Sequence, residues 1–195
     1  GGAVGGGGGA VGGTGGASGT GGAGGSDPCE GQTYLTLPVV VSNSFVITGW
    51  GGAAIESAVS MDNSCPTRSP SPAGLCYDVT YLAGVGTTSW GFIYWQHPEN
   101  NWGSDFGRCI PAGAKVTFYA RGAAGGEAVR FSAGVDHTTQ VTLTTDWTQY
   151  EITFSGNYNA ETEGGGVARG FGWFMNEPVA DTEFFIDSIQ WVAGP

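Results

Sequence analysis

The chain has 195 residues, with 17 acidic and six basic side chains and a formal net charge of −11 at pH 7. Nucleic acids and anionic membranes are bound by clustered Lys and Arg, whereas Lys115 is the only lysine here and the arginines are scattered. No run approaches the length of a membrane-spanning helix. We therefore expect neither nucleic-acid binding nor membrane insertion. The partner is expected to be a neutral polymer, a cation or a protein.

The N-terminal segment has a composition of its own. Residues 1–25 contain 16 glycines, and the other nine residues are Ala, Val, Ser or Thr, so the segment has no charge and cannot bury a core. It can be a flexible linker, or it can form extended three-fold helices that pack against the arms of other copies. We assign residues 1–26 to this Gly-rich arm and residues 27–195, about 170 residues, to one folded domain.

After the arm, the predicted elements are short strands. In chain order they cover 33–37, 38–47, 53–61, 76–82, 89–95, 115–121, 127–135, 138–144, 148–154, 170–176 and 183–191. Alternation is clear in several, for example where Val116, Phe118 and Ala120 alternate with Thr117 and Tyr119. Gly-rich turns such as GAAGGE separate the strands, and no segment has a sustained helical period. This pattern predicts an all-β fold, an antiparallel β-sandwich of jelly-roll type.

The cysteines favour an oxidising compartment. Cys29, Cys65, Cys76 and Cys109 form no CxxC pair, so a zinc site is not expected, and their even number suggests two disulfides. We favour Cys65–Cys76, which closes the short loop CPTRSPSPAGLC, and Cys29–Cys109 by elimination. The alternative is free thiols that pack as small core residues. Disulfides predict a secreted protein, extracellular or at the cell surface.

No motif supports a reaction class. Only His97 and His137 could act as bases near neutral pH, and the chain has no GxSxG, HExxH or GxxxxGK[ST] sequence. A glycosidase needs two placed carboxylates, but 17 acidic residues produce such pairs by coincidence. We therefore expect that the protein is not an enzyme.

The stretch YWQHPENNW combines three large rings with amide and carboxylate groups. A sugar ring has an apolar face that can stack on a flat aromatic ring, and hydroxyls that bind polar groups at the ring edge. We expect Trp95 and Trp102 to stack on sugars, and His97, Gln96 and Asn101 to bind hydroxyls. The predicted binding residues of this stretch are Tyr94, Trp95, Gln96, His97, Asn101 and Trp102.

Other aromatic residues are less constrained by strand patterns. Trp90 alternates with Phe92 and Tyr94 along one strand, whereas Trp50 in ITGWGG and Trp173 in GFGWF are further candidates for sugar binding. The alternative for the whole stretch is that its two tryptophans pack against each other at the rim of the sandwich, because aromatic residues dominate cores as well as interfaces.

Asp187 lies within the hydrophobic strand FFIDSIQW and needs a partner there. It can bind Ca²⁺ together with backbone carbonyls, in which case Glu56 and Asp62 are the candidate co-ligands. The alternatives are a plain buried Asp with a protein partner, or an Asp that faces solvent.

Several segments together resemble a known family. The runs WGFIYWQHPENNWG, PAGAKVTFYARGAAGGEAVRFSAG, VTLTTDWTQYEITFSG, GFGWFMNEP and TEFFIDSIQW resemble non-catalytic carbohydrate-binding modules with a jelly-roll β-sandwich of the galactose-binding-like group. The resemblance covers roughly residues 33–192. It implies an extracellular module, a sugar site of aromatic and amide residues, and a structural Ca²⁺ near Asp187.

These observations predict a secreted, non-catalytic glycan-binding β-sandwich that is tethered or assembled through its Gly-rich arm. Its partner is then a polysaccharide or a cell-surface glycan. The alternative is a structural subunit of an extracellular filament, in which the arms of neighbouring copies pack together and the protein is its own partner.

Overall fold

The computed structural model describes residues 27–135, 137–176, 178 and 180–195. The elements are β1 (Val39–Val40), the 3-10 helix η1 (Val41–Asn43), β2 (Val46–Gly52), β3 (Val59–Asp62), β4 (Cys76–Tyr81), β5 (Trp90–Gln96), β6 (Ala114–Gly122), β7 (Ala128–Ala133), β8 (His137–Thr142), β9 (Thr148–Ile152), the 3-10 helix η2 (Tyr158–Ala160), β10 (Arg169–Asn176) and β11 (Thr182–Ala193). No helix in this described part is long and apolar enough to cross a bilayer. The Gly-rich arm, residues 1–26, lies outside the described residues.

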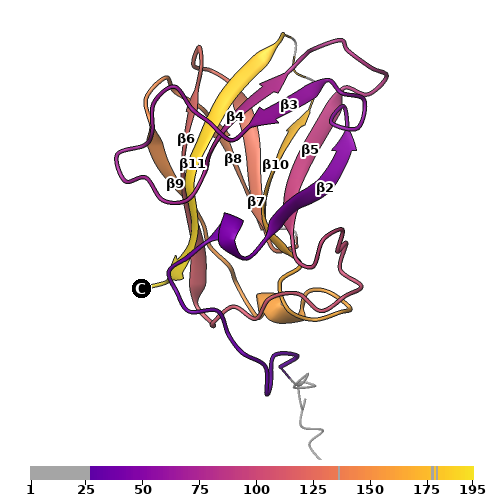
Figure 1. Cartoon of the computed structure of the whole chain (residues 1–195), viewed down its shortest axis with the longest axis vertical. Helices are drawn as coiled ribbons and strands as arrows, with labels where there is room; N and C mark the ends of the chain where they lie inside the picture. The colour runs from indigo at the N-terminus through magenta and orange to yellow at the C-terminus, as the bar shows by residue number, and fades with distance from the viewer. Residues whose placement is uncertain (1–26, 136, 177, 179) are drawn as a thin grey trace, which may run out of the picture.

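Two antiparallel sheets face each other (Figure 1). One has the order β3-β4-β11-β6-β9, with β1 paired to the end of β11, and the other has the order β2-β5-β10-β7-β8. The space between them is filled by side chains that are almost fully buried, including Trp95, Trp173, Trp191, Phe118 and Phe131. The predicted antiparallel β-sandwich is therefore confirmed. The long connections from β5 to β6 and from β9 to β10 lie at the same end of the sandwich (Figure 1).

The start of the domain differs from the prediction. Residues 33–37 form no strand beyond an isolated bridge from Tyr34 to Cys109, and the predicted strand 38–47 is divided into β1, η1 and the first residues of β2. The sequence ITGWGG, which is not among the predicted strands except for its first residue, forms the body of β2. Its glycines are needed because a Cβ on Gly51 would lie 2.2 Å from the ring of Phe92 on the neighbouring strand. Glycine within a strand often marks such a close approach.

Both predicted disulfides are confirmed. Cys29 is bonded to Cys109 and Cys65 to Cys76, each with a Cα–Cα distance of 5.8 Å, and no described cysteine is free. The first bond joins the start of the folded domain, just after the Gly-rich arm, to the connection that precedes β6. The second closes the Pro- and Ser-rich loop onto the first residue of β4.

Candidate functional site

An aromatic row follows the outer face of the β2-β5-β10-β7-β8 sheet. Alternation along β5 sends Trp90, Phe92 and Tyr94 outward, whereas Ile93 and Trp95 point into the core. The rings of Trp90 and Phe92 are stacked with centroids 5.8 Å apart, and those of Phe92 and Tyr94 are 4.7 Å apart. Trp90 remains 38% exposed. Phe92 and Tyr94 are half-buried, so the row is an aromatic surface that is partly open to solvent.

Neighbouring strands leave room for these rings. Phe174 of β10 lies opposite Phe92 and its ring stacks on Trp90 with a centroid distance of 6.4 Å. Tyr94 lies opposite Gly172, where an added Cβ would come within 2.1 Å of the tyrosine ring. Because Gly51 and Gly172 have no side chains, the rings of the row lie across the backbones of β2 and β10.

Trp102 stands beside this surface at a steep angle. Its ring makes edge contacts with Phe92 and Tyr94, at centroid distances of 6.1 and 6.4 Å and interplanar angles of 78° and 82°. Trp102 is 49% exposed. The row therefore forms a floor, and Trp102 forms a wall at one end of it.

Asn101 holds the loop that presents Trp102. Its Nδ2 donates to the carbonyls of His97 and Asp105 at 2.9 and 2.8 Å, and its Oδ1 accepts from the amides of Gly103 and Asp105. Gln96 Nε2 donates to the Asn101 carbonyl at 2.8 Å. The side chains of Gln96 and Asn101 are fully buried, so they position the loop and are not free to bind a ligand.

Asn101→Ala should therefore loosen the loop. We expect the free energy of unfolding to fall by about 2–3 kcal/mol, because four partly buried hydrogen bonds are lost and several loop groups lose their partners. Urea denaturation measures the change, with Glu99→Ala, at an exposed position of the same turn, as the control. Equal stability of the two variants would contradict this role for Asn101.

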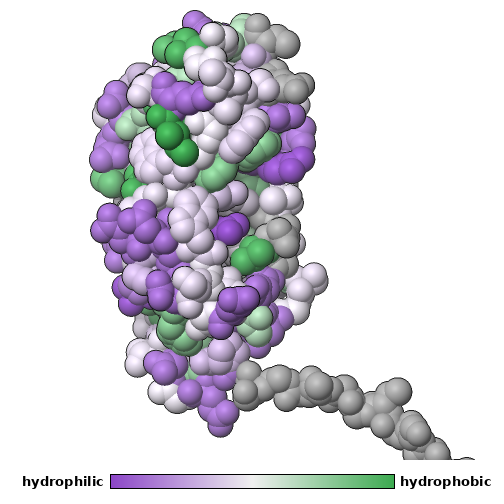
Figure 2. Space-filling model, turned by 90° about the vertical axis from the view of Figure 1, so that its right-hand side faces the viewer, coloured by the Kyte–Doolittle hydropathy of each residue, from purple (hydrophilic) through white to green (hydrophobic). Residues whose placement is uncertain are grey.

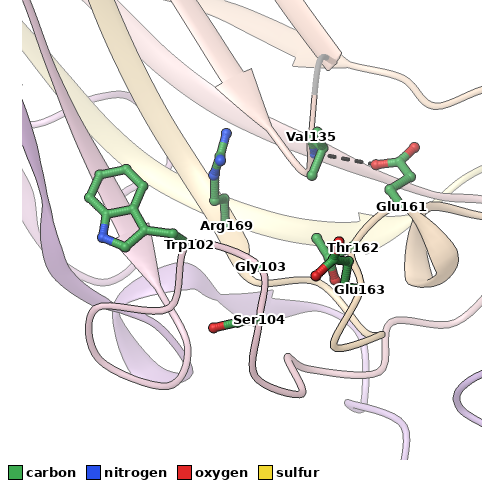
Figure 3. Close-up of a pocket in the computed structure, with 8 residues that line it drawn as sticks. All are labelled: Trp102, Gly103, Ser104, Val135, Glu161, Thr162, Glu163 and Arg169. Carbon is green, nitrogen blue, oxygen red and sulfur yellow. Dashed lines mark hydrogen bonds between the residues drawn. The ribbon is translucent and has the colours of Figure 1, made fainter.

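Two hollows flank the aromatic row. The first has a volume of about 370 Å³ and lies between the Trp102–Ser104 and Glu161–Glu163 loops, with the side chain of Arg169 between them (Figure 3). Across the hollow from Trp102, Glu161 accepts a hydrogen bond from the Val135 amide (Figure 3). The second hollow, of about 200 Å³, lies over β10 and β7 beside Tyr94 and Phe174. Arg169 lines both, with its guanidinium 5.1 Å from the Tyr94 ring centroid.

The structure corrects several predicted sugar-binding residues. Trp95 and Trp173 are 1% and 0% exposed and belong to the core, so they cannot stack on a ligand at the surface. Gln96 and Asn101 are buried and hydrogen-bonded within the protein. The prediction placed them at a sugar because the sequence does not show which of their polar groups the backbone already uses.

The other predicted residues are distributed over the surface. Tyr94 and Trp102 lie together at the aromatic floor and wall. Trp50 is 37% exposed, but it lies opposite Ile93 in the register, on the core-facing side of edge strand β2 and away from the row. His97 is half-buried with its ring edge-on to Phe45, and burial followed by the nearby charge of Arg108 lowers its pKa.

Four residues of this surface were not among the predicted binding residues. They are Trp90, Phe92, Phe174 and Arg169. The signal available in the sequence was the alternation of three aromatic residues along β5, which also suits a core-facing strand. Figure 2 views the molecule from the β2 side and shows hydrophobic side chains as separate spots among pale and hydrophilic ones.

Asp187 has a protein partner. Arg68 binds its carboxylate through Nε and Nη2 at 2.9 and 2.8 Å, and the Ser69 amide donates to it at 2.8 Å. Burial raises the pKa of Asp187, but the hydrogen bonds from Arg68 and Ser69 outweigh burial and lower it overall. A guanidinium in this position does not fit a Ca²⁺ ion beside the same carboxylate.

The two other proposed calcium ligands lie elsewhere. Hydrogen bonds from Thr87 and Thr88 lower the pKa of Glu56 to about 2, and Asp62 lies on β3 opposite Asp78. Among the described residues, no group of three or more His, Cys, Asp or Glu side chains could hold a metal. The assignment of Asp187, Glu56 and Asp62 to one calcium site is therefore corrected, and calcium binding itself stays a prediction.

Replacing Arg68 by Met should reduce stability in a pH-dependent way. We expect a loss of about 1–3 kcal/mol at pH 7, because Asp187 is fully buried while Arg68 is 41% exposed and partly screened. The folded-state pKa of Asp187 lies below its ordinary value of 3.8, so the pair stabilises above that value and its contribution disappears as the pH falls through the folded-state pKa.

Urea denaturation between pH 7 and pH 2 measures the difference between the wild type and this variant. Lys115→Met is the matched control, since Lys115 pairs with a half-exposed Glu151 and should contribute less than about 1 kcal/mol. A difference that persists unchanged at pH 2 would contradict the ion pair as its source.

Comparison with solved structures identifies the class of fold as that of β-sandwich carbohydrate-binding modules. Two structures of a family 30 carbohydrate-binding module have TM-scores of 0.52 and 0.51 at 14% and 15% identity, covering 81% and 82% of this chain and 99% and 89% of the module. A family 11 module of a cellulosomal cellulase from Clostridium thermocellum has a TM-score of 0.46 at 13% identity, covering 84% of this chain and 97% of that one. No protein-family profile and no curated protein matches the sequence. At these identities the likeness to the family 30 module shows a shared fold and no more.

Proposed function

We propose that the protein is a non-catalytic glycan-binding module that binds a polysaccharide across the outer face of the β2-β5-β10-β7-β8 sheet. The observation that carries this proposal is the outward-facing aromatic row, with Trp90 exposed and Phe92 and Tyr94 half-buried, and with the exposed Trp102 as its wall. Flat rings fixed on a strand offer stacking surfaces for successive sugar rings at low entropic cost. The fold shared with carbohydrate-binding modules supports the proposal.

The protein is further proposed to act outside the cell or at its surface. Two disulfides suit an oxidising compartment. The filament alternative depends on the Gly-rich arm, residues 1–26, which lies outside the described residues.

Replacing Trp102 by Ala tests the proposed surface. We expect the affinity for a bound polysaccharide to fall about tenfold or more, that is by about 1.4 kcal/mol or more, because the wall of the site is removed. Native affinity electrophoresis through gels that contain single soluble polysaccharides identifies a ligand and measures the loss.

Trp50→Ala is the matched control, since Trp50 and Trp90 have nearly equal exposed fractions of 37% and 38% but lie on opposite sides of the sheet. We expect Trp90→Ala to weaken binding and Trp50→Ala to leave it unchanged. Equal losses of affinity in Trp90→Ala and Trp50→Ala would reject this surface as the site. Wild-type affinity in Trp102→Ala would reject it as well.

A further inference from the structure

Two cations on the proposed binding face, Arg130 and Arg169, have no carboxylate partner among the described residues. Arg130 is exposed on β7 opposite Phe174, and Arg169 begins β10. The ion pairs found among the described residues are Arg68–Asp187 and Lys115–Glu151, so neither of these two arginines belongs to one. Arg108 and Arg121 belong to no ion pair among the described residues either, so what sets Arg130 and Arg169 apart is their place on the proposed binding face.

The few contacts of these arginines do not account for their positions. The Arg130 guanidinium lies 5.9 Å from the Phe174 ring centroid, and its one side-chain hydrogen bond among the described residues is a long one, 3.4 Å, to Gln140. Arg169 lies over the rings of Tyr94 and Trp102, and its guanidinium has no hydrogen-bond partner among the described residues, although its Nε is itself buried. A guanidinium that stacks on a ring can still donate from its terminal Nη groups, and these are the donors that a ligand could use.

The second hollow brings both arginines to one place. Arg130 and Arg169 line it together with the hydroxyl-bearing residues Ser132 and Thr138, and the rings of Tyr94 and Phe174 form its aromatic side. None of the described residues that line it is acidic. Glu161 and Glu163 line only the first hollow, on the other side of Arg169. The second hollow therefore combines N–H and O–H donors, positive charge and stacking surfaces.

We propose that the second hollow is a subsite for the acidic substituent, a carboxylate or a sulfate, of an anionic polysaccharide. This inference rests on the proposed function and specifies its ligand class. Guanidinium groups bind planar carboxylates and sulfate-like oxyanions through paired N–H donors, and such charge-assisted bonds are stronger than bonds to neutral hydroxyls. The negative charge of the whole chain favours a neutral partner, but this local pair of cations selects an acidic one.

The test compares each acidic polysaccharide with its own neutral form. The chain of residues 1–195 is run in affinity electrophoresis against several polyuronates and their carboxyl-reduced products, and against sulfated galactans and their desulfated products. We expect at least tenfold tighter binding to the acidic member than to the neutral member, either for the polyuronates or for the sulfated galactans. The class that shows this preference identifies the substituent as a carboxylate or a sulfate. We further expect that affinity to fall steeply between 50 and 200 mM salt, as binding of a polyanion does.

Two variants, each of which removes one positive charge, distinguish binding in the subsite from attraction to the overall charge of the protein. Arg130→Gln should reduce the acidic preference to below about threefold, whereas Lys115→Gln, on the other sheet, should leave it intact. Equal binding of acidic and neutral forms by the wild type, or equal effects of the two variants, would overturn the subsite.

The outcomes also distinguish this inference from the proposed function. Binding of neutral polysaccharides that depends on Trp102 but shows no acidic preference rejects the acidic subsite alone. Failure to bind any polysaccharide of the panel, neutral or acidic, rejects both.

Discussion

Trp95→Ala is expected to lower the free energy of unfolding by about 3–5 kcal/mol, as truncation of a fully buried tryptophan generally does. Trp95 is 1% exposed, its ring contacts Tyr77 and Phe171 at centroid distances of 5.0 and 5.5 Å, and its Nε1 donates to the Tyr77 hydroxyl at 3.2 Å. The substitution therefore leaves a cavity between the sheets and a buried hydroxyl without its donor.

Urea denaturation followed by circular dichroism measures this effect, with Trp50→Ala as a control of the same side chain at an edge position. The control should lose less than about 1 kcal/mol, since much of the Trp50 side chain is already exposed. A loss below about 1 kcal/mol for Trp95→Ala would contradict its place in the core. Weak glycan binding by that variant has to be interpreted as a folding effect unless the folded fraction is measured.

Removal of the Cys29–Cys109 disulfide is the second large expected effect. Its cysteines are 80 positions apart in the sequence, against 11 for Cys65–Cys76. The entropy that a disulfide removes from the unfolded chain increases with loop length, which gives about 4–5 kcal/mol for the long loop and about 3 kcal/mol for the short one.

Double Cys→Ala variants compare the two bonds and avoid burying new hydroxyl groups. Cys29 and Cys109 are 0% and 3% exposed, so some packing is lost in addition to the cross-link. Thermal and urea unfolding of both double variants should rank the long-loop variant as the less stable. The reverse order would show that strain or packing, and not loop entropy, determines the contribution of each bond.

Local chemistry made much of the fold predictable. Alternation and turn residues located β4, β6, β9 and β10 to within a residue or two. The two faces of such a strand differ clearly in polarity, or glycines mark its ends. The short Pro- and Ser-rich loop between Cys65 and Cys76 suggested the first disulfide, and the second followed by elimination. The sequence marks Asp187 as a carboxylate in a hydrophobic strand but leaves open Ca²⁺, a protein partner or solvent, because its partner Arg68 lies 119 positions away and no local pattern connects the two.

The binding surface shows where sequence reasoning stops. The sequence by itself determined that β5 has two alternating sets of side chains, and that its polar continuation toward Trp102 is rich in amides. Only the tertiary structure decided which set faces water. Trp90, Phe92 and Tyr94 can lie outside because glycines of β2 and β10, Gly51 and Gly172, leave space for their rings. Those glycines meet β5 only through long-range strand pairing, so the exposed aromatic row is a property of the assembled sheet.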